Sequence, residues 1–280
     1  MPRVSLHAEL IGVVEQPLHI GGVEFFVVHI TEVRPDARQV EICPVLLCSV
    51  IDPIQITDPL RLNQRTDGPS ADAQGAALHS GPLRLQSGAI AAGGLEWMKA
   101  GNGVWHDGGA APGAPMRFYQ LWVALPASEE NSPPESQYIP PEAVQEDGSV
   151  RVILGRYGRA SSPIRASAGI NYFHVGLKDG EKWRYTPPAG HSVAWLSVDE
   201  GRLRSSEAIH AGQLAVFEET GGAIELQADG VTSFVIGSAI KHPHPLILGR
   251  YSVHTNAAAL AQGEGEIRRI GERLRAEGRL

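Results

Sequence analysis

A stretch of glycines, aromatic residues and one histidine between residues 93 and 106 constrains the fold of this chain most strongly. Gly93-Gly94 predicts a turn before the apolar segment Leu95–Met98. A second turn at Gly101-Asn102-Gly103 precedes Val104-Trp105-His106. Glycine turns between short apolar segments are typical of β-hairpins. Because side chains alternate along a strand, we expect His106 on one face and Trp105 on the other. A histidine held by rigid strand backbone suits a ligand or an acid–base role.

The same stretch resembles the signature of the pirin family, a branch of the cupins, which reads approximately P-G-D-x-x-W-M-T-A-G-x-G-x-x-H-S-E. The residues that fall in register are Gly93, Trp97, Met98, Ala100, Gly101, Gly103 and His106. The resemblance continues over Phe118–Pro126, where pirins have L-Q-L-W-V-N-L-P, and over Val150–Gly158, followed by Ser162-Pro163. It implies an all-β fold of two cupin barrels (double-stranded β-helices, or jelly rolls) packed face to face, with a C-terminal helix.

Turn-forming residues favour two halves built of short strands. The chain of 280 residues contains 32 Gly and 20 Pro, and a Pro- and Glu-rich stretch separates the halves. We expect an N-terminal cupin domain over 1–128, a linker over 129–148 and a C-terminal cupin domain over 149–280. Asp52–Gln74 lacks periodicity and predicts a loop. The predicted strands include Val23–Ile30, Val45–Ile51, Ser149–Gly155, Ile170–Leu177, Val193–Val198, Gln213–Phe217, Ala223–Leu226 and Val231–Ser238.

The spacing of apolar residues along the sequence changes in the C-terminal tail, Thr255–Leu280. Apolar residues recur there at helical spacing, and Asn256 can cap the start of a helix. Arginines on this helix alternate with glutamates, which favours a solvated, salt-bridged face over a nucleic-acid surface.

Composition agrees with a monomeric cytoplasmic protein that binds no nucleic acid. The formal net charge is −7, and no apolar run is long enough to span a bilayer. The N-terminus lacks the apolar region of a signal peptide. The two cysteines, Cys43 and Cys48, are expected to be reduced thiols.

The family resemblance implies a metal held by two histidines of an H-P-H-x-G motif, a strand histidine and a glutamate two residues after it. His106 fits the strand histidine, but Gly108 stands where the glutamate belongs. If Gly68 is placed on the glycine of the motif, Gln64 and Thr66 occupy the two histidine positions.

Counting back from His79 instead puts Leu60 and Leu62 at the histidine positions, so neither register supplies a nitrogen ligand. Iron, nickel and copper ions need several converging donors. We therefore expect no cofactor, and His106 as a hydrogen-bonded pocket residue with Gln64, Thr66 and Gly108 around it.

A second histidine pattern, His242-Pro243-His244, has the i, i+2 spacing that sends both imidazoles to one side of an extended segment. His174, His191 or His210 could complete a metal set in space. We favour an exposed or hydrogen-bonded pair over a metal centre.

These observations predict a pirin-like bicupin with a degenerate metal site. Its role would be to bind a small organic molecule or a protein partner. Burial would keep the His106 imidazole neutral, which suits a carbonyl or phenol ligand. The alternative is an oxidoreductase, a metal-dependent dioxygenase of the quercetin 2,3-dioxygenase type that uses iron, copper or nickel.

Overall fold

The structure is a computed structural model that describes residues 86–109, 118–166 and 169–278, together with strand backbone at 4–7, 18–20, 23–30, 39–43, 46–51 and 60–65. Side chains are described for residues 90–105, 119, 121–166 and 169–278. Predictions for other residues, including Thr66 and the rest of the segment 66–85, lie outside the described part.

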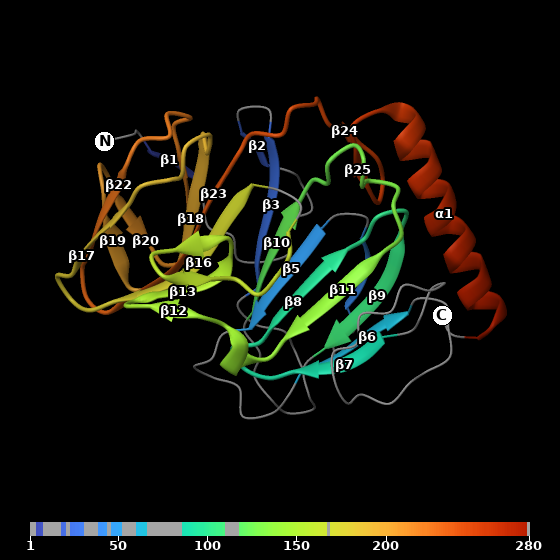
Figure 1. Cartoon of the computed structure of the whole chain (residues 1–280), viewed down its shortest axis with the longest axis horizontal. Helices are drawn as coiled ribbons and strands as arrows, with labels where there is room; N and C mark the ends of the chain where they lie inside the picture. The colour runs from blue at the N-terminus through green and yellow to red at the C-terminus, as the bar shows by residue number, and fades with distance from the viewer. Residues whose placement is uncertain are drawn as a thin grey trace. The chain divides into compact units, whose positions relative to one another are not determined.

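The chain forms two compact units (Figure 1) that are not consecutive in sequence. Unit 1 comprises Met1–Val23 and Glu142–Pro243, and unit 2 comprises Glu24–Pro141 and His244–Leu280. The two units thus exchange their terminal segments, whereas the sequence-based domains follow the chain in order. The segment 129–148, which composition favoured as a linker, carries strand β11 and strand β12.

Unit 1 is built from a seven-stranded and a four-stranded antiparallel sheet. The order of the first is β1-β21-β18-β23-β16-β13-β12 and that of the second is β17-β22-β19-β20. A further hairpin pairs β14 with β15. The strands are β1 (Val4–His7), β12 (Glu146–Asp147), β13 (Val150–Leu154), β14 (Arg156–Tyr157), β15 (Ala160–Ser161), β16 (Ile170–Leu177), β17 (Lys182–Tyr185), β18 (Val193–Glu200), β19 (Arg202–Arg204), β20 (Ala208–His210), β21 (Leu214–Phe217), β22 (Ile224–Ala228) and β23 (Thr232–Ala239).

Unit 2 repeats this plan with another pair of antiparallel sheets. The larger sheet has the order β11-β8-β5-β10-β3-β2, and the smaller has the order β4-β9-β6-β7. The strands of these two sheets are β3 (Val23–Ile30), β4 (Gln39–Cys43), β5 (Leu46–Ile51), β6 (Leu60–Arg65), β7 (Gln86–Ile90), β8 (Leu95–Lys99), β9 (Val104–Gly109), β10 (Phe118–Val123) and β11 (Glu135–Ile139), together with the edge strand β2 (Leu18–Ile20), whose residues fall within Met1–Val23. A short hairpin of β24 (Ile247–Leu248) and β25 (Val253–His254) precedes helix α1 (Ala257–Ala276). A 3-10 turn, η1 (Pro141–Ala143), spans the division between the units.

The all-β class and the single long helix near the C-terminus are confirmed. Strands predicted over Val23–Ile30 and Ile170–Leu177 have those bounds in the structure. The loop predicted for Asp52–Gln74 is wrong at β6, where polar residues alternate within a strand that pairs on both sides. Nothing in the described helices combines the length and the apolar character needed to cross a membrane.

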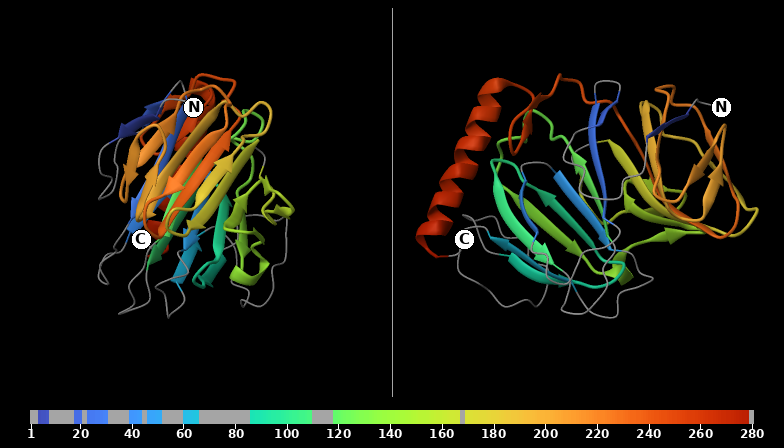
Figure 2. Two further views of the ribbon diagram at one scale, coloured as in Figure 1. Left: turned by 90° about the vertical axis from the view of Figure 1, so that its left-hand side faces the viewer. Right: turned by 180° about the vertical axis from the view of Figure 1, so that it is seen from behind.

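Helix α1 begins at the predicted cap, because the Asn256 side chain accepts a hydrogen bond of 2.9 Å from the amide of Ala259. Its apolar side packs on unit 2, in the region of β9, as Figures 1 and 2 show in red. The buried residues of the helix are Ala259, Gly263, Ile267, Ile270, Gly271 and Leu274.

A buried imidazole–carboxylate pair joins the segment before α1 to the rest of unit 2. His254 Nδ1 lies 3.5 Å from Glu130 Oε2, and both side chains are almost fully buried. The same carboxylate accepts hydrogen bonds of 2.7 Å from the amide and the hydroxyl of Thr255. On the other side of the ring, a Cβ built at Gly263 would come within 2.7 Å of His254 Nε2. Glycine is therefore needed at this point of the helix.

We predict that His254 makes the stability of the protein depend on pH. Burial lowers the pKa of His254 below its ordinary value of 6.5, although the charges of Glu130 and Glu264 act in the opposite direction. The unfolded chain then binds the proton more readily than the folded one. The stability is fully present above pH 6.5 and falls as the pH drops below it.

Chemical denaturation between pH 7.5 and 5 measures this effect. His254→Met should flatten the fall in unfolding free energy, whatever its effect at pH 7.5. Part of the slope should persist, because burial also lowers the pKa of His191. Equal slopes in the variant and the wild type would contradict the prediction.

Candidate functional site

His106 lies on β9 between two neighbouring strands of the smaller sheet of unit 2. Its Cα partner on β6 is Gln64, and its partner on β4 is Glu41. Residues directly opposite in an antiparallel pair share one face of the sheet. Glu41, His106 and Gln64 therefore form one row across three strands. Two residues along β9, Gly108 is opposite Leu62.

Trp105 fixes which face of β9 carries this row. Its indole Nε1 donates a hydrogen bond of 2.9 Å to the carbonyl of Ile267, and its ring packs with Ile270 and Leu274 of α1. A Cβ at Gly271 would come within 2.6 Å of the indole, so the helix approaches closely there. Trp105 therefore faces helix α1 and points away from the barrel interior. The positions of Val104, His106 and Gly108 belong to the opposite face.

That opposite face of β9 turns toward the larger sheet of unit 2. Met98 of β8, Ala100 and Val104 form one buried cluster, and Trp122 of β10 packs against it. Residues two apart on a strand share a face. The position of His106 therefore lies on the same side as Val104, and Glu96 lies on the same side of β8 as Met98.

Glu96 is a buried carboxyl group that sequence reasoning did not select. It is only 1% exposed and stands directly opposite Tyr138 of β11. Burial, together with the charge of the neighbouring Glu96, raises the pKa of Tyr138 far above its ordinary value. Tyr138 therefore stays protonated beside Glu96.

The barrel of unit 1 is filled with apolar side chains. A continuous buried cluster from both sheets occupies it, including the packed aromatic rings of Phe173, Trp183, Tyr185 and Phe234.

Polar groups near this cluster bond to one another. Asn171 Nδ2 donates to the Tyr185 hydroxyl at 3.0 Å, and Ser238 Oγ lies 2.7 Å from that hydroxyl and 2.8 Å from His191 Nδ1.

The histidine pair of the H-P-H pattern lies between β23 and β24. His242 is half-buried and His244 is exposed, and the division between the two units falls directly before His244. Among the side chains that the structure describes, no group of three or more His, Cys, Asp or Glu residues is arranged to hold a metal ion.

Comparison with curated proteins finds pirin relatives. The chain is 28% identical over 171 residues to a Pseudomonas aeruginosa protein whose name proposes a quercetin 2,3-dioxygenase, covering 57% of this chain and 60% of that protein. It is 32% identical over 173 residues to a pirin-like protein of Caulobacter vibrioides (56% and 60%). It is 29% identical over 153 residues to Pirin-1 of Arabidopsis thaliana (51% and 52%). The chain thus spans little more than half the length of these relatives, and no protein-family model matches it.

Solved structures give the fold. A quercetin 2,3-dioxygenase from Acinetobacter baumannii matches with a TM-score of 0.69 at 19% identity, covering 88% of this chain and 84% of that one. A bacterial pirin from Escherichia coli, solved in complex with nickel(II), matches with a TM-score of 0.56 at 13% identity (85% and 100%). The fold is that of a bicupin, a chain with two cupin barrels. Two of the curated relatives are named pirin or pirin-like, so the chain is similar to pirin-like proteins over the matched half of its length.

The nickel in one structural neighbour calls for a test of this chain's donors. In the paired strands β6 and β9, positions 62, 64, 106 and 108 hold leucine, glutamine, histidine and glycine. Only one of these is a good ligand for nickel, iron or copper, and Glu41 on the third strand adds a single carboxylate. This row does not fit a metal centre built from several imidazoles.

We predict that Glu96 and Tyr138 are energetically coupled inside unit 2. Glu96→Leu should lower the unfolding free energy by about 2 kcal/mol, because the buried Tyr138 hydroxyl loses the polar group beside it. In Tyr138→Phe the hydroxyl is already gone, so adding Glu96→Leu should cost about 1 kcal/mol less than it does alone. Urea denaturation of the two single variants and the double variant measures this coupling. Additive losses would show that the two groups do not interact.

Proposed function

We propose that the first barrel, in unit 2, binds a small organic molecule and does not operate as a metal-dependent oxygenase. The observation that carries the proposal is the strand register, which puts Gln64 and Leu62 opposite His106 and Gly108. A single imidazole beside an amide is better suited to hydrogen bonding than to holding a metal ion.

Several features support a ligand of mixed polarity. Met98, Trp122 and Val104 supply apolar and aromatic surface on the faces that turn toward each other. Glu96 adds a buried acceptor and His106 an imidazole position. A neutral imidazole offers one donor and one acceptor, which suits a phenol or a carbonyl group. Aromatic surface with a few placed polar groups is the usual composition of a small-molecule site.

Titration with quercetin, followed by quenching of tryptophan fluorescence, tests the proposal. We expect saturable binding to the metal-free protein and a loss of at least tenfold in affinity in His106→Leu, because the hydrogen-bonding ring is removed. His244→Leu is the matched control, since His244 is exposed outside the strands of both barrels. Equal binding by wild type and His106→Leu, or no binding by either, would refute His106 as an anchor.

The alternative function is a metal-dependent dioxygenase, favoured by the name of the Pseudomonas relative and by the fold shared with a quercetin 2,3-dioxygenase. Elemental analysis after dialysis against a chelator distinguishes the two. We predict less than stoichiometric iron, copper or nickel and no quercetin-dependent oxygen uptake. Stoichiometric metal that is lost in His106→Ala would overturn the metal-free proposal in favour of this alternative.

A third role, binding of a protein partner, belongs to a different class. We rank it below ligand binding because no feature of the described surface selects a protein partner. We also propose that the protein is monomeric and binds no nucleic acid, in keeping with its net charge of −7.

A further inference from the structure

The smaller sheet of unit 1 has a polar outer face that the proposed function does not use. On β17, Trp183 and Tyr185 are buried while Lys182 and Arg184 are exposed, and β22 alternates in the same way. This face is hollowed by a concavity of about 420 Å³, a volume that suits a small molecule. It is lined by Lys182, Trp183, Arg184, Arg204, Ser205, Glu225, Leu226 and Gln227.

Two cationic residues flank an amide in one row of this sheet. Lys182 of β17 is opposite Gln227 of β22, and Gln227 is opposite Arg204 of β19. Neighbouring strands lie about 4.8 Å apart, so the backbones at Lys182 and Arg204 are separated by about 10 Å. A ligand with two acidic groups can reach both side chains, because lysine and arginine are long and flexible.

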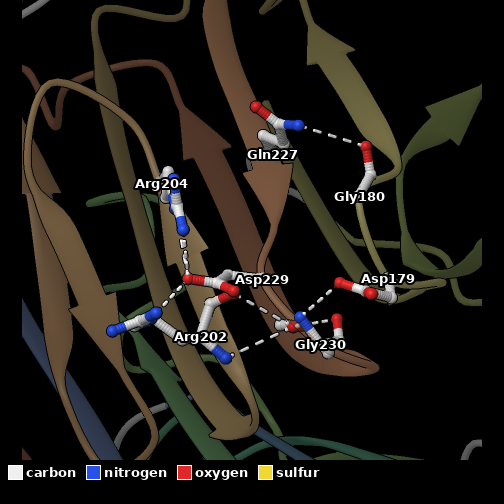
Figure 3. A network of polar contacts seen from close by, with 8 residues as sticks. Asp179, Gly180, Arg202, Arg204, Gln227, Asp229 and Gly230 are labelled. Atoms are coloured by element: carbon white, nitrogen blue, oxygen red, sulfur yellow. Dashed lines mark hydrogen bonds and ion pairs between the residues drawn. The ribbon is translucent and has the colours of Figure 1, made fainter.

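Arg204 is held in place by an acidic partner, Asp229, which follows strand β22. Asp229 Oδ2 accepts hydrogen bonds from Arg204 Nη2 at 2.7 Å and from Nε at 3.1 Å, and a further one from Arg202 (Figure 3). These hydrogen bonds hold the pKa of Asp229 below its ordinary value. One carboxylate thus pairs with two guanidinium groups. The net charge of Asp229, Arg202 and Arg204 together is therefore positive.

Of the other two cationic residues that line the concavity, one is paired with an acidic residue and one is not. Arg184 pairs with Glu225 at 3.1 Å. Lys182 forms no side-chain hydrogen bond or ion pair with any described residue. Three cationic residues and one acid line the concavity, in a chain whose net charge is −7. This local excess of positive charge points to an anionic ligand.

We propose that this concavity binds a small polyvalent anion, carrying either phosphate or several carboxylate groups, through Lys182 and Arg204. Nε and Nη2 of Arg204 each bond to Asp229, so its Nη1 group and the second Nη2 hydrogen can donate to acidic oxygens, and the Lys182 ammonium group supplies a mobile charge. The Ser205 hydroxyl can add a donor. The inference is independent of the first barrel, because every residue it uses belongs to unit 1.

Calorimetric titration of the full chain with pyrophosphate and, separately, with citrate tests the inference at low ionic strength. We expect one anion per chain and about tenfold weaker binding in both Lys182→Gln and Arg204→Gln, since each removes a charge-assisted hydrogen bond. The matched control is Lys178→Gln, which makes the same charge change at an exposed lysine that does not line the concavity. The probe that binds more tightly tells phosphate from carboxylate chemistry.

Three results would overturn the proposal. These are failure of both anions to bind, equal binding by the wild type and the two concavity variants, and equal weakening in Lys178→Gln. The last result would mean that the affinity for the anion depends only on the overall charge of the protein. Far-UV circular dichroism checks folding, and because Lys182 and Arg204 are both exposed, each variant should keep the wild-type spectrum.

Discussion

The contact between Trp105 and helix α1 determines how unit 2 is organised. The indole donates to the carbonyl of Ile267 and packs over Gly271, so one face of β9 is covered by the helix. Strand alternation then assigns His106 and Gly108 to the other face, with Val104. The helix thus defines the inside of the first barrel, although it contributes no residue to the row of Glu41, His106 and Gln64.

Local sequence signals predicted the elements whose pattern is unambiguous. The glycine turns around Leu95–Met98 and the largely apolar segment Val23–Ile30 both predict strands, and both are strands. The sequence of strand β6, Leu60–Arg65, favours a loop, because four of its six residues are polar. Its pairing with β7 and β9 supplies backbone hydrogen bonds that weak local propensity does not reveal.

The candidate site was harder to predict, because its members meet through long-range pairing. His106 could be selected from its motif, but Glu41 stands opposite it from a strand 65 residues earlier. Glu96 carried one usable signal, a charged residue between the apolar Leu95 and Trp97. Its partner Tyr138 lies on β11, inside the segment interpreted as a linker. Register between distant strands depends on tertiary packing, so no local pattern reports it.

The two barrels share one plan of a larger and a smaller antiparallel sheet, yet their interiors differ. In unit 1, aromatic rings fill the barrel, and the polar groups of Tyr185, Ser238 and His191 satisfy one another. Such an interior stabilises the unit, because its described polar groups bond to one another. The anion site that we propose for unit 1 lies instead on its outer face, where the alternation of β17 turns Lys182 and Arg184 toward solvent. In unit 2 the helix covers the outer face of β9, so the ligand site that we propose there lies on the inner face. The two proposed sites thus use opposite faces of barrels that share one architecture.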